Sequence, residues 1–101
     1  MRLYIDTSNS ENIVVAIDDK KFETRAREEK SQKLLSFIDE IMKKKGKTIK
    51  DITEIEVNLG PGSFTGLRVG LSIANALGWL LGIPVNGKNL RKGEFVDILY
   101  T

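Results

Sequence analysis

Gly60-Pro61-Gly62-Ser63-Phe64-Thr65-Gly66 is the segment that decides the fold, because it joins a short strand to a long apolar helix. The pattern predicts the strand over Glu54 to Leu59 and the helix from about Thr65 to Leu81. Gly82-Ile83-Pro84-Val85 then ends the helix and begins a further strand. The three elements form a βαβ unit, so we expect its two strands to be parallel, with a right-handed crossover.

Four more segments have the pattern of strands. A short apolar run predicts the first strand, Arg2 to Ile5. The continuous β-branched run from Asn12 to Asp18 is typical of a strand that is covered on both faces. In Lys21 to Arg27, apolar and charged residues alternate, which predicts an edge strand. A last alternating segment, Glu94 to Thr101, predicts a terminal strand.

A second helix is predicted over Ser31 to Lys45, where apolar residues recur at steps of three and four. We expect Ser31 to cap its N-terminus and Gly46 to close its C-terminus. The lysine run at Lys43 to Lys45 complements the negative end of the helix dipole. The same run is able to contact phosphates, but a solvated helix end is the reading that the residues favour.

The composition bounds the classes of function. With 101 residues, 41% of them apolar and 30% charged, the chain has room for one compact domain over residues 1–101. Histidine and cysteine are absent, which removes the usual general base, thiolate nucleophiles and zinc-finger ligands, and we predict neither a catalytic set nor a metal site. No signal-peptide pattern is present, and the apolar stretch from Leu67 to Leu81 is too short and too interrupted to span a membrane. We therefore expect a cytoplasmic protein that makes no membrane contact.

The glycine-rich turn has two readings. Strand-turn-helix geometry presents backbone N–H groups to an anion, but Gly66 is followed by Leu67 and Arg68, unlike a P-loop, and the glycine spacing does not fit a dinucleotide turn. The alternative is a tight structural turn, in which Ser63 or Thr65 caps the helix and Pro61 stiffens the entry. The residues alone favour the structural turn and leave phosphate binding open.

The helix after the turn is apolar on more than one face. Its large apolar residues share one face and are Val69, Ile73, Ala76, Leu77 and Leu80. Gly70, Ala74 and Gly78 form a small-residue stripe that lets another element approach closely. One sheet covers only one face in a chain this small, so we expect a second helix or another protein to cover the rest. The predicted partner-binding residues are Leu34, Leu35, Ile38, Met42, Arg68, Leu71, Ala74, Asn75, Gly78 and Trp79.

Two segments together resemble a known family. Tyr4-Ile5-Asp6-Thr7-Ser8 resembles the opening of an ASKHA (actin-like ATPase) lobe. The run from Gly60 to Gly70, with Gly82-Ile83-Pro84-Val85 downstream, resembles the signature of the TsaB (YeaZ) family. The resemblance runs in register from residue 3 to about residue 86 and includes Leu34-Leu35 and Ile49-Lys50-Asp51-Ile52.

The resemblance implies an α/β fold: a single ribonuclease-H-like lobe with a mixed five-stranded sheet, two main helices and an extra C-terminal strand. It implies a noncatalytic scaffold that binds a TsaD-type enzyme through the two helices, with a TsaE-type ATPase as a further partner, in the attachment of threonylcarbamoyl to adenosine in tRNA. Contact with tRNA would then be indirect, and ATP with Mg²⁺ would bind only at an interface with a partner. Asp6 is expected to cap the turn that follows it.

The chain also departs from that family. Typical members have two lobes, whereas only the first is recognised here, and the segment from Leu90 to Tyr100 resembles the start of the second. Two alternatives therefore stay open. One is a small phosphate- or nucleotide-binding protein that uses the Gly60 turn and Asp6, and the other is a module that forms a homodimer through the same helices.

Overall fold

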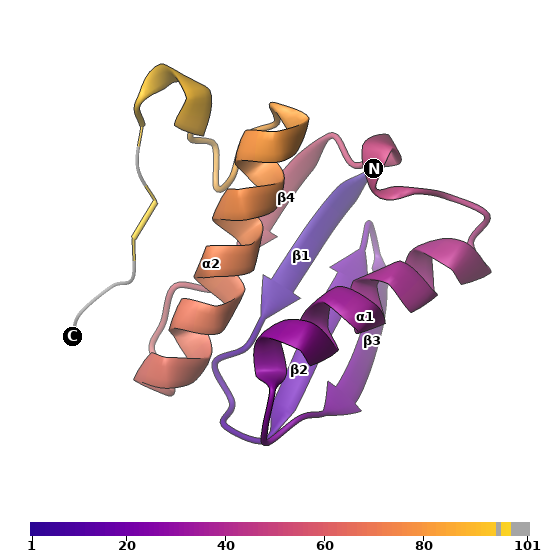
Figure 1. Cartoon of the computed structure of the whole chain (residues 1–101), viewed down its shortest axis with the longest axis vertical. Coiled ribbons are helices and arrows are strands. Elements are labelled where there is room, and N and C mark those ends of the chain that lie inside the picture. Colours follow the sequence, from indigo (N-terminus) through magenta and orange to yellow (C-terminus); the bar gives the residue numbers. More distant parts are fainter. Residues whose placement is uncertain (95, 98–101) are drawn as a thin grey trace.

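A four-stranded mixed sheet with two helices on one face makes up the fold (Figure 1). The computed structural model describes residues 1–94, 96 and 97. The strand order is β3-β2-β1-β4, with β1 antiparallel to β2 and parallel to β4. The elements in chain order are β1 (Arg2–Asp6), β2 (Asn12–Ile17), β3 (Lys20–Arg25), α1 (Lys30–Lys44), the 3₁₀ helix η1 (Ile49–Asp51), β4 (Glu54–Val57), α2 (Phe64–Leu81) and the 3₁₀ helix η2 (Leu90–Lys92).

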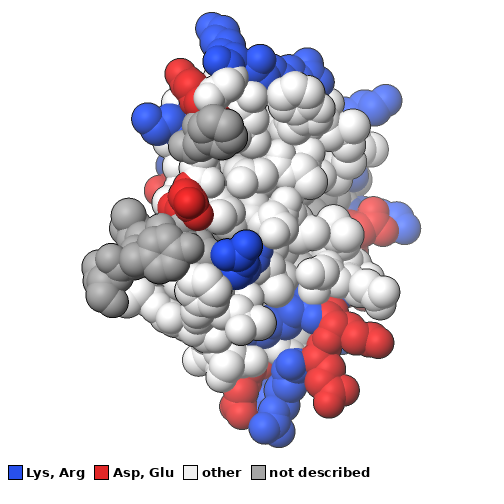
Figure 2. Space-filling view, turned by 60° about the vertical axis from the view of Figure 1, so that its left-hand side comes forward, with Lys and Arg blue, Asp and Glu red and all other residues white. Residues whose placement is uncertain are grey.

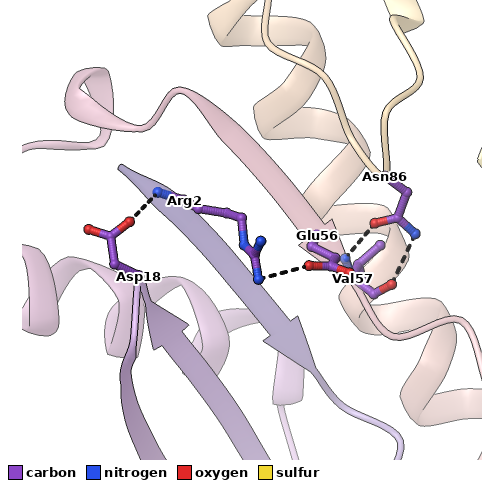
Figure 3. Close-up of polar contacts among 5 residues, drawn as sticks. All are labelled: Arg2, Asp18, Glu56, Val57 and Asn86. Carbon is purple, nitrogen blue, oxygen red and sulfur yellow. Dashed lines mark hydrogen bonds and ion pairs between the residues drawn. The ribbon is translucent and has the colours of Figure 1, made fainter.

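The core lies between the sheet and the two helices. Alternate residues of β1, β2 and β4 point toward the helices and are buried, in keeping with the period of two of a strand. They are Leu3, Ile5, Ile13, Val15, Ile17, Ile55 and Val57. The prediction that the second strand is covered on both faces is wrong, because the other face of β2 is only half-buried. The helices lie on one side of the sheet, and Arg2 and Glu56 form an ion pair of 3.2 Å on the other (Figure 3).

The described residues form four strands in the sheet, and the expected fifth is not confirmed. Val85 makes an isolated parallel bridge to Ile55 in place of a strand. On either side of Val85 the backbone pairs with Ile55 alone: Ile55 N donates to Pro84 O at 2.9 Å, and Asn86 N donates to Ile55 O at 2.9 Å. At the next position along β4, the side-chain amide of Asn86 accepts a hydrogen bond from Val57 N at 2.8 Å and donates one to Val57 O at 3.1 Å (Figure 3). The outer edge of β4 is thus paired by backbone at Ile55 and by a side chain at Val57.

The predicted C-terminal residue of α1 is confirmed, but the predicted N-cap is wrong. Gly46 follows the helix with a φ of 67°, in the left-handed conformation expected of a closing glycine. The predicted cap, Ser31, lies inside the helix, and Glu29 occupies the N-cap position with a φ of 52° and no capping hydrogen bond from its side chain. The sequence does not indicate this N-cap, because glutamate seldom adopts the left-handed conformation that Glu29 has here.

The C-terminal segment differs from the prediction where it is described. Leu90–Lys92 form the 3₁₀ helix η2 against the end of α2, and Glu94, Val96 and Asp97 belong to no strand. Residue 95 and residues 98–101, which the predicted last strand includes, lie outside the described residues.

Among the described residues, α2 is the one helix that is long and apolar enough to cross a membrane by length and composition. The expectation that this stretch is too short is therefore corrected. Its buried residues pack on the sheet. We draw no membrane role from it.

Candidate functional site

The candidate site is an exposed apolar surface on the two helices, which we call the docking face: Leu35 of α1 and Phe64, Trp79 and Leu80 of α2. Their exposed fractions are 47% for Leu35, 49% for Phe64, 57% for Trp79 and 64% for Leu80. Figure 2 shows a broad surface on the α2 side of the molecule with few charged groups. Large apolar side chains exposed on two helices that contact each other are typical of a binding surface.

The side of α2 that faces the sheet is made of small residues, which inverts the sequence interpretation. Gly66, Gly70, Ala74 and Gly78 are buried against the chain's own strands and loops. Leu80, which the sequence places on one face with Leu77, is exposed, whereas Leu77 is buried. The small residues let the helix axis approach the sheet closely, so its larger side chains are turned to the flanks and outward.

The predicted partner-binding residues therefore divide into two groups. Five of them lie in the core, where no partner can touch them while the fold is intact: Leu34, Ile38, Met42, Ala74 and Gly78. The other five are exposed or half-buried: Leu35, Arg68, Leu71, Asn75 and Trp79. The direct-contact prediction is restricted to this second group, to which the structure adds Phe64 and Leu80.

Two polar groups lie among these apolar side chains. The guanidinium of Arg68 lies 5.4 Å from the centre of the Phe64 ring, which is within cation–π range. The Oδ1 atom of Asn75 is buried and has no hydrogen-bond partner among the described residues. A buried acceptor without a partner is costly to the fold.

The glycine motif is held by Thr7, a fully buried residue just after β1. Its hydroxyl donates a hydrogen bond to Gly66 O and accepts one from Gly70 N at 3.1 Å. These are the two groups that pair across one turn of a regular helix, so the hydroxyl joins the helix at that turn. A Cβ atom on Gly66 would lie less than 3.0 Å from the Thr7 carbonyl oxygen. The glycines of the motif thus serve a close approach of β1 to α2.

The amide groups of the turn are largely used within the chain. Gly60 N donates to Asn58 Oδ1 at 3.1 Å, and Ser63 N donates to Ser8 O at 2.8 Å. Ser63 caps α2, as predicted, by accepting a hydrogen bond from Gly66 N at 3.3 Å. An anion at this turn would have to displace these bonds, so the geometry favours the structural reading of the motif over phosphate binding.

Asp6 also caps its own turn, as expected. Its Oδ1 accepts hydrogen bonds from Ser8 N at 2.9 Å and from Asn58 Nδ2 at 3.1 Å. Burial acts to raise the pKa of Asp6, but the hydrogen bonds from Ser8, Asn58 and Tyr4 outweigh it and hold the pKa below its usual value. Nearby, burial lowers the pKa of Lys30, against the attraction of the Asp6 charge. The arrangement stabilises a charged carboxylate and leaves it poorly suited to accept a proton.

Asp6 should make the fold sensitive to acid. Since its pKa is lower in the folded state, its contribution to stability is present above the unfolded pKa of about 3.9 and is lost as the pH falls through that value toward the folded pKa. We expect the urea midpoint of Asp6→Asn to fall less between pH 7 and pH 3 than that of the unchanged chain. The exposed-site control, Glu28→Gln, should match the unchanged chain, and an Asp6→Asn profile identical to both would contradict the assignment.

Arg91 of η2 fixes the end of α2 that carries Trp79. Its Nε donates to Trp79 O at 2.8 Å and its Nη2 donates to Leu80 O at 2.9 Å, which satisfies two carbonyl groups of the last helical turn. Asn89 holds η2 in turn, by accepting a hydrogen bond from Arg91 N at 3.0 Å. Sequence reasoning missed this contact, since no local pattern links residues 79 and 91.

Replacing Arg91 should therefore destabilise the last turn of α2, which carries Trp79 and Leu80 of the docking face. For Arg91→Met we expect the free energy of unfolding to fall by about 1–2 kcal/mol, because two charge-assisted hydrogen bonds are lost. Thermal unfolding measures this change, with Lys92→Met as the neighbouring control. Equal midpoints for the two variants would show that the contact does not hold the helix end.

Comparison with known proteins identifies relatives of this arrangement. The family model described as "TsaD: tRNA N6-adenosine threonylcarbamoyltransferase" matches residues 23–89. The chain is 34% identical to the tRNA threonylcarbamoyladenosine biosynthesis protein TsaB of Buchnera aphidicola over 84% of its own length and 42% of the relative's. It is 34% identical to TsaB of Escherichia coli over 84% of the chain and 38% of the relative, and 30% identical to TsaB of Bacillus subtilis over 83% and 38%.

The solved structure of YeaZ from Pseudomonas aeruginosa has the same fold. It superposes with a TM-score of 0.69 at 23% identity, over 83% of this chain and 41% of that one. The chain thus spans about two fifths of the length of the relatives that it matches.

Proposed function

Because the chain belongs to the family described by the TsaD model and, within it, to the TsaB (YeaZ) proteins, we propose that it acts in tRNA threonylcarbamoyladenosine biosynthesis as a noncatalytic subunit. In this role it binds a TsaD-type protein through the docking face. A TsaE-type ATPase is a further partner of the same assembly, which works in the cytoplasm. Any ATP with Mg²⁺ would bind at an interface with a partner.

The observation that carries the proposal is which side chains of α2 are buried and which are exposed. The helix buries its small residues in its own core and leaves Trp79 and Leu80 outward at exposed fractions above one half. Tryptophan is enriched among the residues that dominate binding energy at protein interfaces. An exposed aromatic side chain on a helix end whose carbonyl groups are bonded by Arg91 suits a protein partner.

The chemistry of the described residues supports a binding role. They contain no group of three or more aspartate and glutamate side chains placed to hold a metal ion, and the sequence has no histidine or cysteine. The turn that resembles an anion site uses its amides internally. The phosphate-binding alternative is correspondingly less well supported than the docking role.

A homodimer is the second candidate function of the docking face. Two copies are able to cover the same apolar surface about a two-fold axis, which buries Trp79 of each against the other. The homodimer and the complex with a TsaD-type protein then compete for one surface. A dimer that dissociates when the TsaD-type protein is added would favour this shared use.

Size exclusion with light scattering tests the proposal. The purified chain is run alone, then with the TsaD-type protein of the same organism at micromolar concentrations. We expect one co-eluting complex whose mass equals the sum of its parts. Separate elution at these concentrations would count against the proposed function.

A further inference from the structure

Lysines from two separate stretches of sequence gather at one end of the molecule, and we propose that this end binds the phosphate backbone of RNA. The group, which we call the lysine end, consists of Lys20, Lys43, Lys44, Lys45 and Lys47. All five are exposed. The choice of RNA among polyanions rests on the proposed function, in which the substrate is a tRNA.

The structure places Lys20 beside the run at the end of α1, which the sequence does not show. The amino group of Lys45 lies 5.9 Å from the centre of the Phe22 ring of β3. Lys20 is two residues before Phe22 on the same strand, so both side chains lie on the side of the sheet that α1 covers. The turn between β2 and β3 and the end of α1 therefore form one surface.

Lys47 stays on that surface because the chain folds back at the helix end. Gly46 has a φ of 67°, and Lys47 N donates a hydrogen bond to Met42 O at 2.9 Å. Attraction to the helix dipole explains basic residues in the last turn, which are Lys43 and Lys44. It does not explain Lys20, which comes from a strand, or Lys47, which follows the helix.

Few carboxylates neutralise the lysine end. Of its five members, Lys43 alone has an ion pair in the described structure, with Asp39 at 3.0 Å. Asp19 precedes Lys20, and Glu40 lies one helical turn before Lys44, but neither forms an ion pair within 4.0 Å there. Four lysines without an ion pair in the described structure attract a polyanion, and lysine contacts phosphate as a point charge without reading sequence.

This inference replaces the expectation that tRNA is reached only through the partner protein. The lysine end lies at the C-terminus of α1, and the docking face runs along α2 with Leu35 in the second turn of α1. A residue near the start of α1 is about 15 Å from the lysine end at 1.5 Å per residue. The two surfaces are thus separate enough for one molecule to contact a protein and an RNA together.

Two triple variants with the same net charge test the inference. Lys20→Gln, Lys44→Gln and Lys47→Gln remove the lysine end, while Lys33→Gln, Lys88→Gln and Lys92→Gln remove three exposed lysines elsewhere. Lys45 is kept, because its stem packs on Phe22. Binding of an unmodified tRNA transcript to the full chain is measured by fluorescence anisotropy at about 50 to 200 mM salt.

We expect the lysine-end variant to bind tRNA about tenfold more weakly at the lowest salt, and the slope of log affinity against log salt to become shallower by about two to three. The control variant should keep most of the affinity and slope. Equal losses in both variants, or an unchanged slope, would overturn the inference. So would competition by poly-glutamate as strong as that by tRNA at equal charge, since this would indicate an acidic protein as the occupant.

Size exclusion of both variants with the TsaD-type protein separates this inference from the proposed function. The lysine-end variant should still form the protein complex. Loss of tRNA binding with the protein complex intact supports a separate RNA surface. An unchanged chain that binds the protein but no tRNA would refute the lysine end alone, and one that binds tRNA but no protein would refute the docking role alone.

Discussion

Replacing Gly66 with alanine should lower the free energy of unfolding by about 2–3 kcal/mol, the range for forcing extra atoms into a packed site. On an exposed helix the same change would stabilise the fold by up to about 1 kcal/mol, because alanine is the better helix former. The sign reverses here because the new Cβ would meet the carbonyl oxygen of Thr7, which is backbone and cannot rotate away. Urea unfolding followed by circular dichroism measures the change.

Two variants on the same helix serve as controls for this prediction. Gly78→Ala should destabilise less, since its Cβ would meet a methyl group of Val85, a side chain that is able to shift. Ser72→Ala is exposed and should be neutral or slightly stabilising. If Gly66→Ala were as stable as Ser72→Ala, the close approach of β1 to α2 would be wrong.

Replacing Trp79 with alanine should weaken binding to a TsaD-type protein by about thirtyfold or more, which corresponds to about 2 kcal/mol for an aromatic residue at the centre of an interface. The fold should be little affected, because the side chain is 57% exposed in the isolated chain. Biolayer interferometry gives the dissociation constant, and thermal unfolding checks that stability is retained.

A graded series makes the Trp79 prediction specific. Trp79→Phe keeps an aromatic ring and should lose less affinity than Trp79→Ala. Ser36→Ala, on an exposed position of α1 away from the docking face, should leave the affinity unchanged. An alanine variant that binds as tightly as the unchanged chain would remove Trp79 from the interface.

The strands and helices were largely predictable because each is encoded by its own residues. Short apolar and β-branched runs gave β1, β2 and β4, and the switch to a period of three and four gave α1. The extent of the fifth strand was not predictable, because backbone pairing stops after Ile55 and the side-chain amide of Asn86 takes over at Val57, a contact between residues far apart in sequence. The local pattern of apolar and polar residues does not reveal that a side-chain amide will take the place of a backbone amide in the sheet.

The docking face was predictable only in part, for a physical reason. A hydrophobic pattern ranks residues by their transfer from water, so it grouped Leu80 with Leu77 on one face and left Ala74 and Gly78 among the residues for a partner. The short distance between α2 and the rest of the core determines which residues are buried. The hydroxyl of Thr7 and the side chain of Val85 fit only against residues that lack a large side chain. Trp79, a predicted partner-binding residue, is 57% exposed.

Hydroxyl-radical footprinting of the chain, alone and with the TsaD-type protein, tests most directly whether the outer side of α2 is the protein-binding surface. Trp79 reports on the docking face, and Tyr4, which lies on the opposite face of the sheet, serves as the internal reference. We predict that oxidation of Trp79 falls severalfold in the complex while oxidation of Tyr4 is unchanged. Protection of Tyr4 with Trp79 still fully oxidised would contradict the account.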